Sequence, residues 1–196
     1  MFTHGSEVIG WINGQLRFGI RPGLSRMKEA LKQLNQPHLK VPTIHIAGTN
    51  GKGSTVTYLR CVLEEAGYRV GTFTSPYIET FNERISLNGR PISDEDLVKC
   101  ANRIYSVVDL INQSDLGPFT EFEIITLLAF VYFEEADVDV VIYEVGLGGR
   151  LDATNVIKPM VCGITNIGLD HEQILGSART QIAYEKLGIV KQGVPL

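Results

Sequence analysis

The sequence predicts an α/β fold in which a parallel sheet carries helices on both faces. Short apolar runs alternate along the chain with segments of helical periodicity. The 20 glycines concentrate at the junctions between apolar runs, where strands turn into helices. A chain of 196 residues that is 44% hydrophobic can bury one sizeable core. We therefore expect one globular unit, at most a domain and a fraction.

After a polar N-terminal stretch that is broken at Pro22-Gly23, strands and helices begin to alternate. The apolar run Thr43–Ala47 predicts a first strand, and a glycine-rich loop follows it. Apolar residues then recur at steps of three and four from Val56 to Ala66, which predicts a helix that Gly67 stops. A second strand is predicted at Arg69–Thr74.

The segment Ser75–Arg90 is polar and rich in turn residues, so we interpret it as a candidate active-site loop. Ser93 and Asp96 have the spacing of a capping box, and the apolar stripe that runs from Leu97 to Ile111 predicts a helix after it. The run Glu121–Ala136 is apolar on all sides and predicts a buried helix.

Residues Val138–Val145 are rich in Val and Ile, which predicts a buried parallel strand. A fourth strand is predicted at Val161–Ile167 and a last helix at Thr180–Val190. The final residues, Val194-Pro195-Leu196, resemble the start of a further strand.

Charge and cysteine content exclude several classes of protein. With 18 Lys and Arg against 22 Asp and Glu, the formal charge of −4 offers no basic field to a nucleic acid. The longest apolar run, 124–133, is about half as long as a membrane span. The N-terminus lacks the features of an export signal, which predicts the cytoplasm. The three cysteines have no C-x-x-C spacing, so we expect small core residues rather than disulfides or zinc ligands.

Polar residues follow each predicted strand. The glycine-rich loop follows the first strand, Ser75 the second, Glu144 ends the third, and Asp170-His171 lie beyond the fourth. Ligands of open parallel sheets bind outside the carboxyl ends of the strands, where the strand order reverses. The sequence therefore predicts a site for a nucleotide and a metal at this edge.

The loop GTNGKGST (48–55) has the composition of a phosphate loop. Its glycines let several backbone N–H groups point at an anion, Lys52 adds charge for the β- and γ-phosphates, and Ser54 or Thr55 offers a hydroxyl. The strict P-loop pattern is not matched, because Ile46 stands at the position of its first glycine and an extra glycine follows the lysine. An ordinary strand-to-helix turn is the alternative, and the placement between strand and helix favours the phosphate loop.

Three further residues have more than one interpretation each. Glu144 ends an apolar strand, so it either binds a metal, pairs with Arg150, or has its pKa raised until it is neutral. His171 is a metal ligand or an ordinary hydrogen-bonded histidine, and a lone imidazole is an unusual ligand for magnesium. Lys186 shares a helix face with isoleucines, so it either extends its amine to solvent or is buried with a lowered pKa.

Six ordered motifs together resemble the folylpolyglutamate synthase and dihydrofolate synthase branch of the Mur ligases. They are HIAGTNGKGST (45–55), TSPY with FNERI (74–85), TEFE (120–123), YEVGLGGRLDATN (143–155), TNIGLDHEQILG (165–176) and IAYEKLGIVK (182–191). The resemblance implies the P-loop-type ATPase domain of that family. It also implies an ATP-dependent ligase that phosphorylates the carboxylate of a folate or dihydropteroate and joins it to glutamate.

The resemblance assigns roles to individual residues. ATP would be held by Thr49, Asn50, Gly51, Lys52, Gly53, Ser54 and Thr55. Ser75 and Glu144 would bind one Mg²⁺ and His171 a second. Lys186 matches the lysine that the family carbamylates, and it would act in catalysis with Lys52 and His171. The pterin pocket would draw on Pro76, Arg84, Thr120, Phe122, Asp152 and Ala153.

The resemblance also implies what lies outside this chain. Residues 1–196 would be the N-terminal part of the ATP-binding domain, without the rest of that domain or the C-terminal glutamate-binding domain. The parent protein would be a cytoplasmic monomer whose partners are small molecules: ATP, glutamate, and folate or dihydropteroate, with no nucleic acid and no membrane. The alternatives are a non-catalytic nucleotide- or pterin-binding module and another P-loop phosphotransferase, such as a small kinase. The run GLGGR (146–150) does not have the G-x-G-x-x-G spacing of a dinucleotide site.

Overall fold

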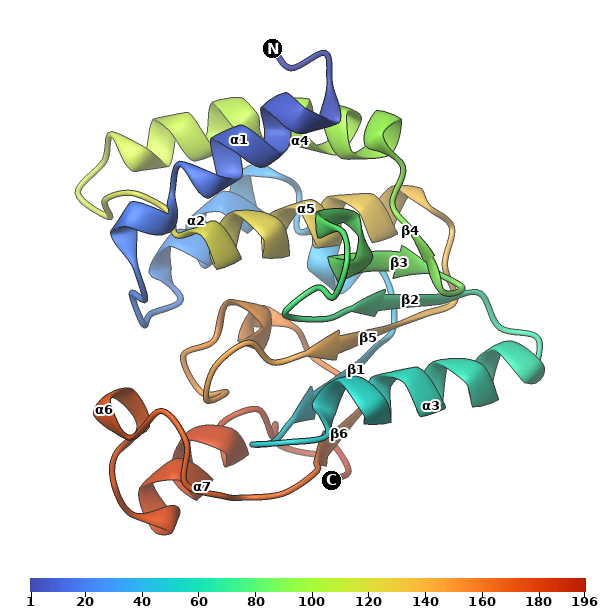
Figure 1. The fold of residues 1–196 in the computed structure, drawn as a ribbon, viewed down its shortest axis with the longest axis vertical. Coiled ribbons are helices and arrows are strands. Elements are labelled where there is room, and N and C mark those ends of the chain that lie inside the picture. Colours follow the sequence, from blue (N-terminus) through green and yellow to red (C-terminus); the bar gives the residue numbers. More distant parts are fainter.

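The computed structural model describes residues 1–196 as one six-stranded sheet with helices on both faces (Figure 1). The strands are β1 (Thr43–Ala47), β2 (Val70–Phe73), β3 (Ile85–Leu87), β4 (Arg90–Pro91), β5 (Val140–Glu144) and β6 (Val161–Ile164). The helices are α1 (Gly5–Asn13), α2 (Ser25–Gln33), α3 (Lys52–Glu65), α4 (Asp94–Asn112), α5 (Glu121–Glu135), α6 (Glu172–Leu175) and α7 (Arg179–Leu187). Short 3₁₀ helices lie at Leu16–Phe18, Pro37–Leu39, Phe81–Arg84 and Ala153–Val156.

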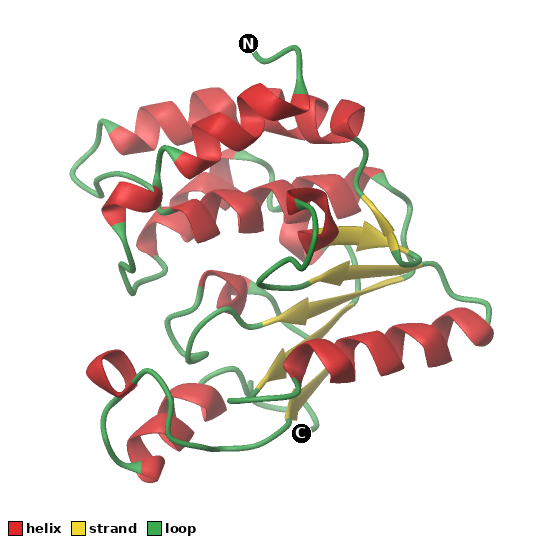
Figure 2. Ribbon diagram, in the orientation of Figure 1, coloured by secondary structure: helices red, strands yellow, loops and turns green.

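The strand order is β4-β3-β2-β5-β1-β6. Strands β2, β5, β1 and β6 run parallel, as the sequence predicts, whereas β3 and β4 extend the sheet as an antiparallel hairpin. The arrowheads of β2 and β5 point to one edge, where several loops gather (Figure 2). The sheet is therefore mixed, and its parallel part brings the carboxyl ends of β1, β2 and β5 together.

The two faces of the sheet are packed by different layers. On one face, Val56 of α3 packs in a small apolar cluster with alternate strand residues such as Ile46 and Ile142. On the other face the main core contains Phe73, Tyr143 and most of the apolar residues of α5. Helices α1, α2 and α4 contact α5, and α1 and α4 form the outermost layer of Figure 1. The prediction of a buried helix flanked by glutamates is confirmed by α5.

Several sequence expectations need correction. The polar N-terminal stretch contains two helices, α1 and α2, and the segment 75–90 contains β3, the start of β4 and a 3₁₀ turn rather than loop alone. The fourth strand ends at Ile164 instead of Ile167, and the last helix ends at Leu187 instead of Val190. Cys61 is exposed on α3, because it lies on the helix face away from the sheet. The other two cysteines are buried, as expected.

The last residues of the chain pair with the edge strand β6. The Cys162 N–H, in β6, donates to the Pro195 carbonyl over 2.9 Å, so the last residues lie along the outer edge of the sheet. None of the helices has both the length and the apolar character that crossing a membrane requires.

Candidate active site

The glycine-rich loop joins the end of β1 to the start of α3. Gly51 caps the helix with φ of 79°, a left-handed conformation that glycine adopts without strain, and Lys52 is the first helical residue. The first N–H groups of a helix have no partner within it, so this end of α3 presents donors and a partial positive charge to an anion. The Lys52 amine bends back and donates to the Gly48 carbonyl over 3.1 Å. This geometry is that of a phosphate loop.

The segment after β6 holds the loop in place. The Asn166 side-chain oxygen accepts from the N–H groups of Thr49 and Asn50 over 3.2 and 3.0 Å. The Thr165 hydroxyl donates to the Asn50 carbonyl over 2.6 Å. The loop is therefore anchored from the neighbouring strand. Sequence reasoning assigned no role to Thr165 or Asn166, because it placed both residues within the predicted fourth strand.

Glu144 ends β5 on the face that α3 covers. Its side chain is only 4% exposed, its Oε1 lies 3.9 Å from the Lys52 amine, and its Oε2 accepts from the Ser75 N–H over 3.4 Å. Burial raises the pKa of the Glu144 carboxyl to about 7, although the Lys52 charge and the Ser75 N–H act in the opposite direction. The alternative of a pair with Arg150 is wrong, because Arg150 pairs with Glu185 at 2.8 Å.

Lys186 approaches the same place from α7. The residue is 4% exposed, so the alternative of an amine extended into solvent is wrong. Burial lowers the pKa of the Lys186 amine, the nearby Lys52 charge lowers it further, and Asp170 partly restores it. A lysine whose uncharged form is favoured in this way is chemically able to act as a nucleophile or to be carbamylated. The structure thus groups Lys52, Lys186 and Asp170, while leaving any modification of Lys186 as a prediction.

His171 is less well integrated than the other predicted site residues. It is the residue before α6, its side chain is 54% exposed, and its Nε2 lies 3.7 Å from the Asp170 carboxylate. No group of three or more His, Cys, Asp or Glu side chains is arranged to hold a metal ion. A metal role for His171 therefore stays a prediction from the family motif.

The donor set around Glu144 nevertheless fits magnesium. Mg²⁺ in phosphate-transfer sites is held by one or two carboxylates, a hydroxyl, waters and the phosphates themselves. A Cβ at Gly53 would lie 3.5 Å from Glu144 Oε2, so the absence of a side chain there leaves space between the loop and the carboxylate. Glu144 and Ser75 are the residues of this chain that would hold the ion.

A pocket of about 530 Å³ opens beside these groups. Ser75 belongs both to the pocket wall and to the contact with Glu144, so the pocket adjoins the phosphate loop. All of the residues that the resemblance assigns to a pterin line it, namely Pro76, Arg84, Thr120, Phe122, Asp152 and Ala153. Arg84 pairs with Glu121 at 3.3 Å and lies over the Tyr77 ring, and its Nε is buried without a partner. Such a planar cation suits an anionic, planar ligand.

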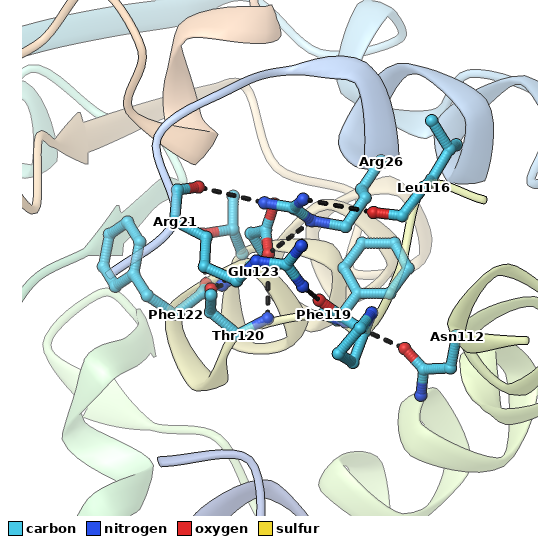
Figure 3. A network of polar contacts seen from close by, with 10 residues as sticks. Arg21, Arg26, Asn112, Leu116, Phe119, Thr120, Phe122 and Glu123 are labelled. Atoms are coloured by element: carbon cyan, nitrogen blue, oxygen red, sulfur yellow. Dashed lines mark hydrogen bonds and ion pairs between the residues drawn. The ribbon is translucent and has the colours of Figure 1, made fainter. Parts of the chain in front are cut away.

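The opposite wall of the pocket is formed by the segment between α1 and α2, which sequence reasoning missed. Arg21, Pro22 and Gly23 of that segment line the pocket. Figure 3 shows how a buried network fixes this wall to α5. The Arg26 guanidinium, at the start of α2, pairs with Glu123 of α5 at 3.0 Å and also donates to the Arg21 carbonyl over 2.9 Å. No local sequence signal predicts a pair of charges 97 residues apart.

Comparison with known proteins places these observations in a family. The Bacillus subtilis dihydrofolate synthase/folylpolyglutamate synthase is 54% identical over 197 residues, which cover 100% of this chain and 46% of that protein. The chain belongs to the folylpolyglutamate synthase and dihydrofolate synthase family. It corresponds to the N-terminal portion of these proteins and spans about half the length of the curated relatives it matches. No protein-family model matches the chain.

Solved structures of the family have the same fold. The folylpolyglutamate synthase of Thermotoga maritima superimposes with a TM-score of 0.90 at 41% identity, covering 98% of this chain and 43% of that one. A folylpolyglutamate synthase complex with AMPPCP and folate gives a TM-score of 0.90 at 39% identity, covering 98% and 47%. The predicted fold, a Mur-ligase-type α/β domain, is therefore confirmed.

Proposed function

We propose that the protein carrying these residues is an ATP-dependent ligase that joins L-glutamate to the carboxylate of a folate or dihydropteroate through an acyl phosphate. The observation that carries the proposal is the position of Ser75, which lines the large pocket and contacts the buried Glu144 next to the phosphate loop. A carboxylate at the end of a ligand in the pocket would thus face the γ-phosphate of a nucleotide on the loop. The related complex with AMPPCP and folate supports both ligands.

The residues of this chain supply positioning and charge in the reaction. A carboxylate oxygen attacks the γ-phosphorus, ADP leaves, and the glutamate amine then displaces phosphate from the acyl carbon. Lys52 and the N–H groups at the start of α3 would neutralise the charge that spreads over the phosphate oxygens. Glu144 and Ser75 would hold a Mg²⁺ ion, which draws electron density from the transferring phosphoryl group. We propose that Lys186 and His171 also help to neutralise the charge on the phosphate oxygens.

Several finer statements remain predictions. These are the second Mg²⁺ site at His171, the carbamylation of Lys186, the cytoplasmic location, the monomeric state, and the absence of nucleic-acid and membrane partners. That residues 1–196 form the first part of an ATP-binding domain is also a prediction.

Phosphate release tests the proposed function. In the parent protein that carries these residues, we expect release only when ATP, glutamate and a folate or dihydropteroate are all present, which separates a ligase from a small kinase or a binding module. Lys52→Ala should lower turnover by at least about 100-fold, because it removes the positive charge of the lysine amine, which would stabilise the transferring phosphate. Lys99→Ala, which removes an exposed lysine of α4 that pairs with Glu135, is the matched control and should change turnover little. Lys52→Ala protein with half the original turnover would contradict a phosphate loop.

A further inference from the structure

His45 occupies an unusual position in the middle of β1. The strand is buried along its whole length, and its neighbours Ile44 and Ile46 face α3. His45 points to the opposite face, where it has no exposed surface. Burial lowers the pKa of the imidazole to about 3, so the ring is neutral at physiological pH. A neutral, polar ring in the centre of a sheet costs stability unless its nitrogens find partners.

A chain of hydrogen bonds leads from His45 to the pocket. The imidazole Nε2 lies 2.8 Å from the Thr154 hydroxyl, and that hydroxyl lies 2.5 Å from Asp152 Oδ1. Burial raises the pKa of the Asp152 carboxyl, and the Thr154 hydroxyl and the surrounding backbone N–H groups act in the opposite direction. In its ionised form this carboxyl only accepts, so the single hydroxyl hydrogen of Thr154 is donated to it. The hydroxyl must then accept from His45, which fixes the proton of the ring on Nε2. The buried Nδ1 has no partner, in agreement with this tautomer.

Asp152 is the pocket end of this chain. The residue is buried and belongs to the pocket lining, and its two carboxylate oxygens also accept from the Thr154 N–H over 3.0 Å and from the Leu147 N–H over 2.9 Å. Its Oδ1 is thus held by both polar groups of Thr154. If the hydroxyl hydrogen were free to rotate away, the carboxylate would lose one of these contacts and could turn in the pocket.

We infer that His45 is a positioning residue for the pterin-type substrate: its Nε2–H commits the Thr154 hydroxyl to Asp152 and so fixes the substrate-facing carboxylate. The inference rests on the proposed function, because it needs Asp152 to contact the ligand in the pocket. His45 does not line the pocket, so it would affect binding of the heterocycle only through Thr154 and Asp152. It would not affect binding of ATP.

Calorimetric titration with folate and, separately, with AMPPCP tests this role. Thr154→Val should weaken folate binding about tenfold while AMPPCP binding is unchanged, and Thr154→Ser should restore folate binding. His45→Leu should weaken folate binding by a smaller factor, about threefold. Because His45 acts through Thr154, His45→Leu should add no further loss in the Thr154→Val background. His38→Leu is the matched control, since His38 is a half-buried histidine that, like His45, has an unpartnered Nδ1, and it packs on Phe130, away from the pocket.

The outcomes separate this inference from the proposed function. Original protein that binds neither folate nor dihydropteroate overturns the proposed function and with it the substrate role of His45. Original protein that binds folate, with variants that bind it equally well or with additive losses from His45 and Thr154, overturns the positioning role alone. The tautomer is tested without any substitution: ¹⁵N-resolved NMR of the histidine rings should show His45 protonated on Nε2. Protonation on Nδ1 would overturn the hydrogen-bond chain.

Discussion

At the scale of single residues, the site contains ionisable groups whose burial in the protein lowers its stability. Glu144 and Lys186 are both nearly excluded from solvent. Burial raises the pKa of the Glu144 carboxyl and lowers that of the Lys186 amine, so the neutral form of each group is favoured. Lys52, at 3.9 Å, compensates Glu144 only in part. This cost is understandable for groups that would receive a cation or a phosphate, because the missing partner arrives with the ligand.

Glu144→Gln should make stability less dependent on pH. The folded-state pKa of Glu144 is about 7 against an ordinary value of 4.5, so the cost of its burial is absent below pH 4.5 and grows to its full size above pH 7. We expect the variant to gain about 2 kcal/mol relative to the original protein between pH 5 and pH 8, measured by urea unfolding at each pH. Glu65→Gln, at the exposed end of α3, is the control and should show no such trend. A gain that is equal at both pH values would contradict the proposed burial of charge.

The ion pair between Arg26 and Glu123 predicts a different response. Each partner is nearly buried, and Glu123 also accepts from the N–H and hydroxyl of Thr120 over 2.8 and 3.0 Å. Glu123→Ala should therefore destabilise the fold by about 3 to 5 kcal/mol, because it leaves the Arg26 charge buried without a partner. Glu64→Ala, which breaks the surface pair with Arg60, should cost at most about 1 kcal/mol. Equal losses in urea unfolding would contradict a structural role for the buried pair.

At the scale of elements, the long apolar segments could be predicted and the short or mixed ones could not. Periodicity and capping signals locate β1, α3, α4, α5 and β5 within a few residues. Helix α2 was missed although its buried face carries Met27, Ala30 and Leu31 at helical spacing. The charged Arg26, whose partner lies in α5, shares that face. The β3-β4 hairpin was missed although its turn, Asn88-Gly89, has the positive φ angles that this dipeptide favours. That signal was present in the sequence.

The candidate site divides in a similar way. Motif resemblance found the six pocket residues because each lies within a contiguous motif, and the structure brings them to one pocket. Two features were not found: the pocket lining around Arg21, and the hydrogen bonds by which Asn166 holds the phosphate loop. Both depend on which segments lie next to each other in space. Sequence spacing carries no information on such neighbours without the strand order.

The contact between the phosphate loop and the segment after β6 can be tested at Gly48. A Cβ at this position would lie 1.8 Å from the Thr165 hydroxyl, and the φ of 151° disfavours other residues. Gly48→Ala should displace Thr165, lower stability by about 1 to 3 kcal/mol and weaken AMPPCP binding at least about tenfold. Folate binding should change little. Gly10→Ala, in helix α1 with no atom within 4 Å of the new Cβ, should instead raise stability by about 0.5 to 1 kcal/mol. Unchanged AMPPCP binding in Gly48→Ala protein would contradict the anchoring role.

At the scale of the whole molecule, two histidines link the folding equilibrium to pH. Burial lowers the pKa of His45 to about 3 and that of His38 to about 4, against an ordinary value of 6.5. The unfolded chain therefore binds more protons than the folded protein below pH 6.5. The stability that these neutral rings contribute is present above pH 6.5, decreases as the pH falls below 6.5, and is fully lost once the pH is below their folded-state pKa values.

The acid limb of the stability curve should reflect these rings. His45 alone should make the free energy of unfolding fall by about 1.4 kcal/mol per pH unit below pH 6.5, and His38 should add to that slope. Glu134 and Glu135, whose pKa values are lowered chiefly through their ion pairs with lysine and arginine, act in the same direction only below pH 4.5, whereas the raised pKa of Glu144 opposes the trend. In urea unfolding between pH 6.5 and pH 5, His45→Leu should therefore flatten the slope, and the double variant with His38→Leu should flatten it further. The slope is the deciding quantity, because each substitution also changes stability at neutral pH. An unchanged slope in the double variant would show that the two rings are protonated in the folded protein and that the interior around β1 admits the charge.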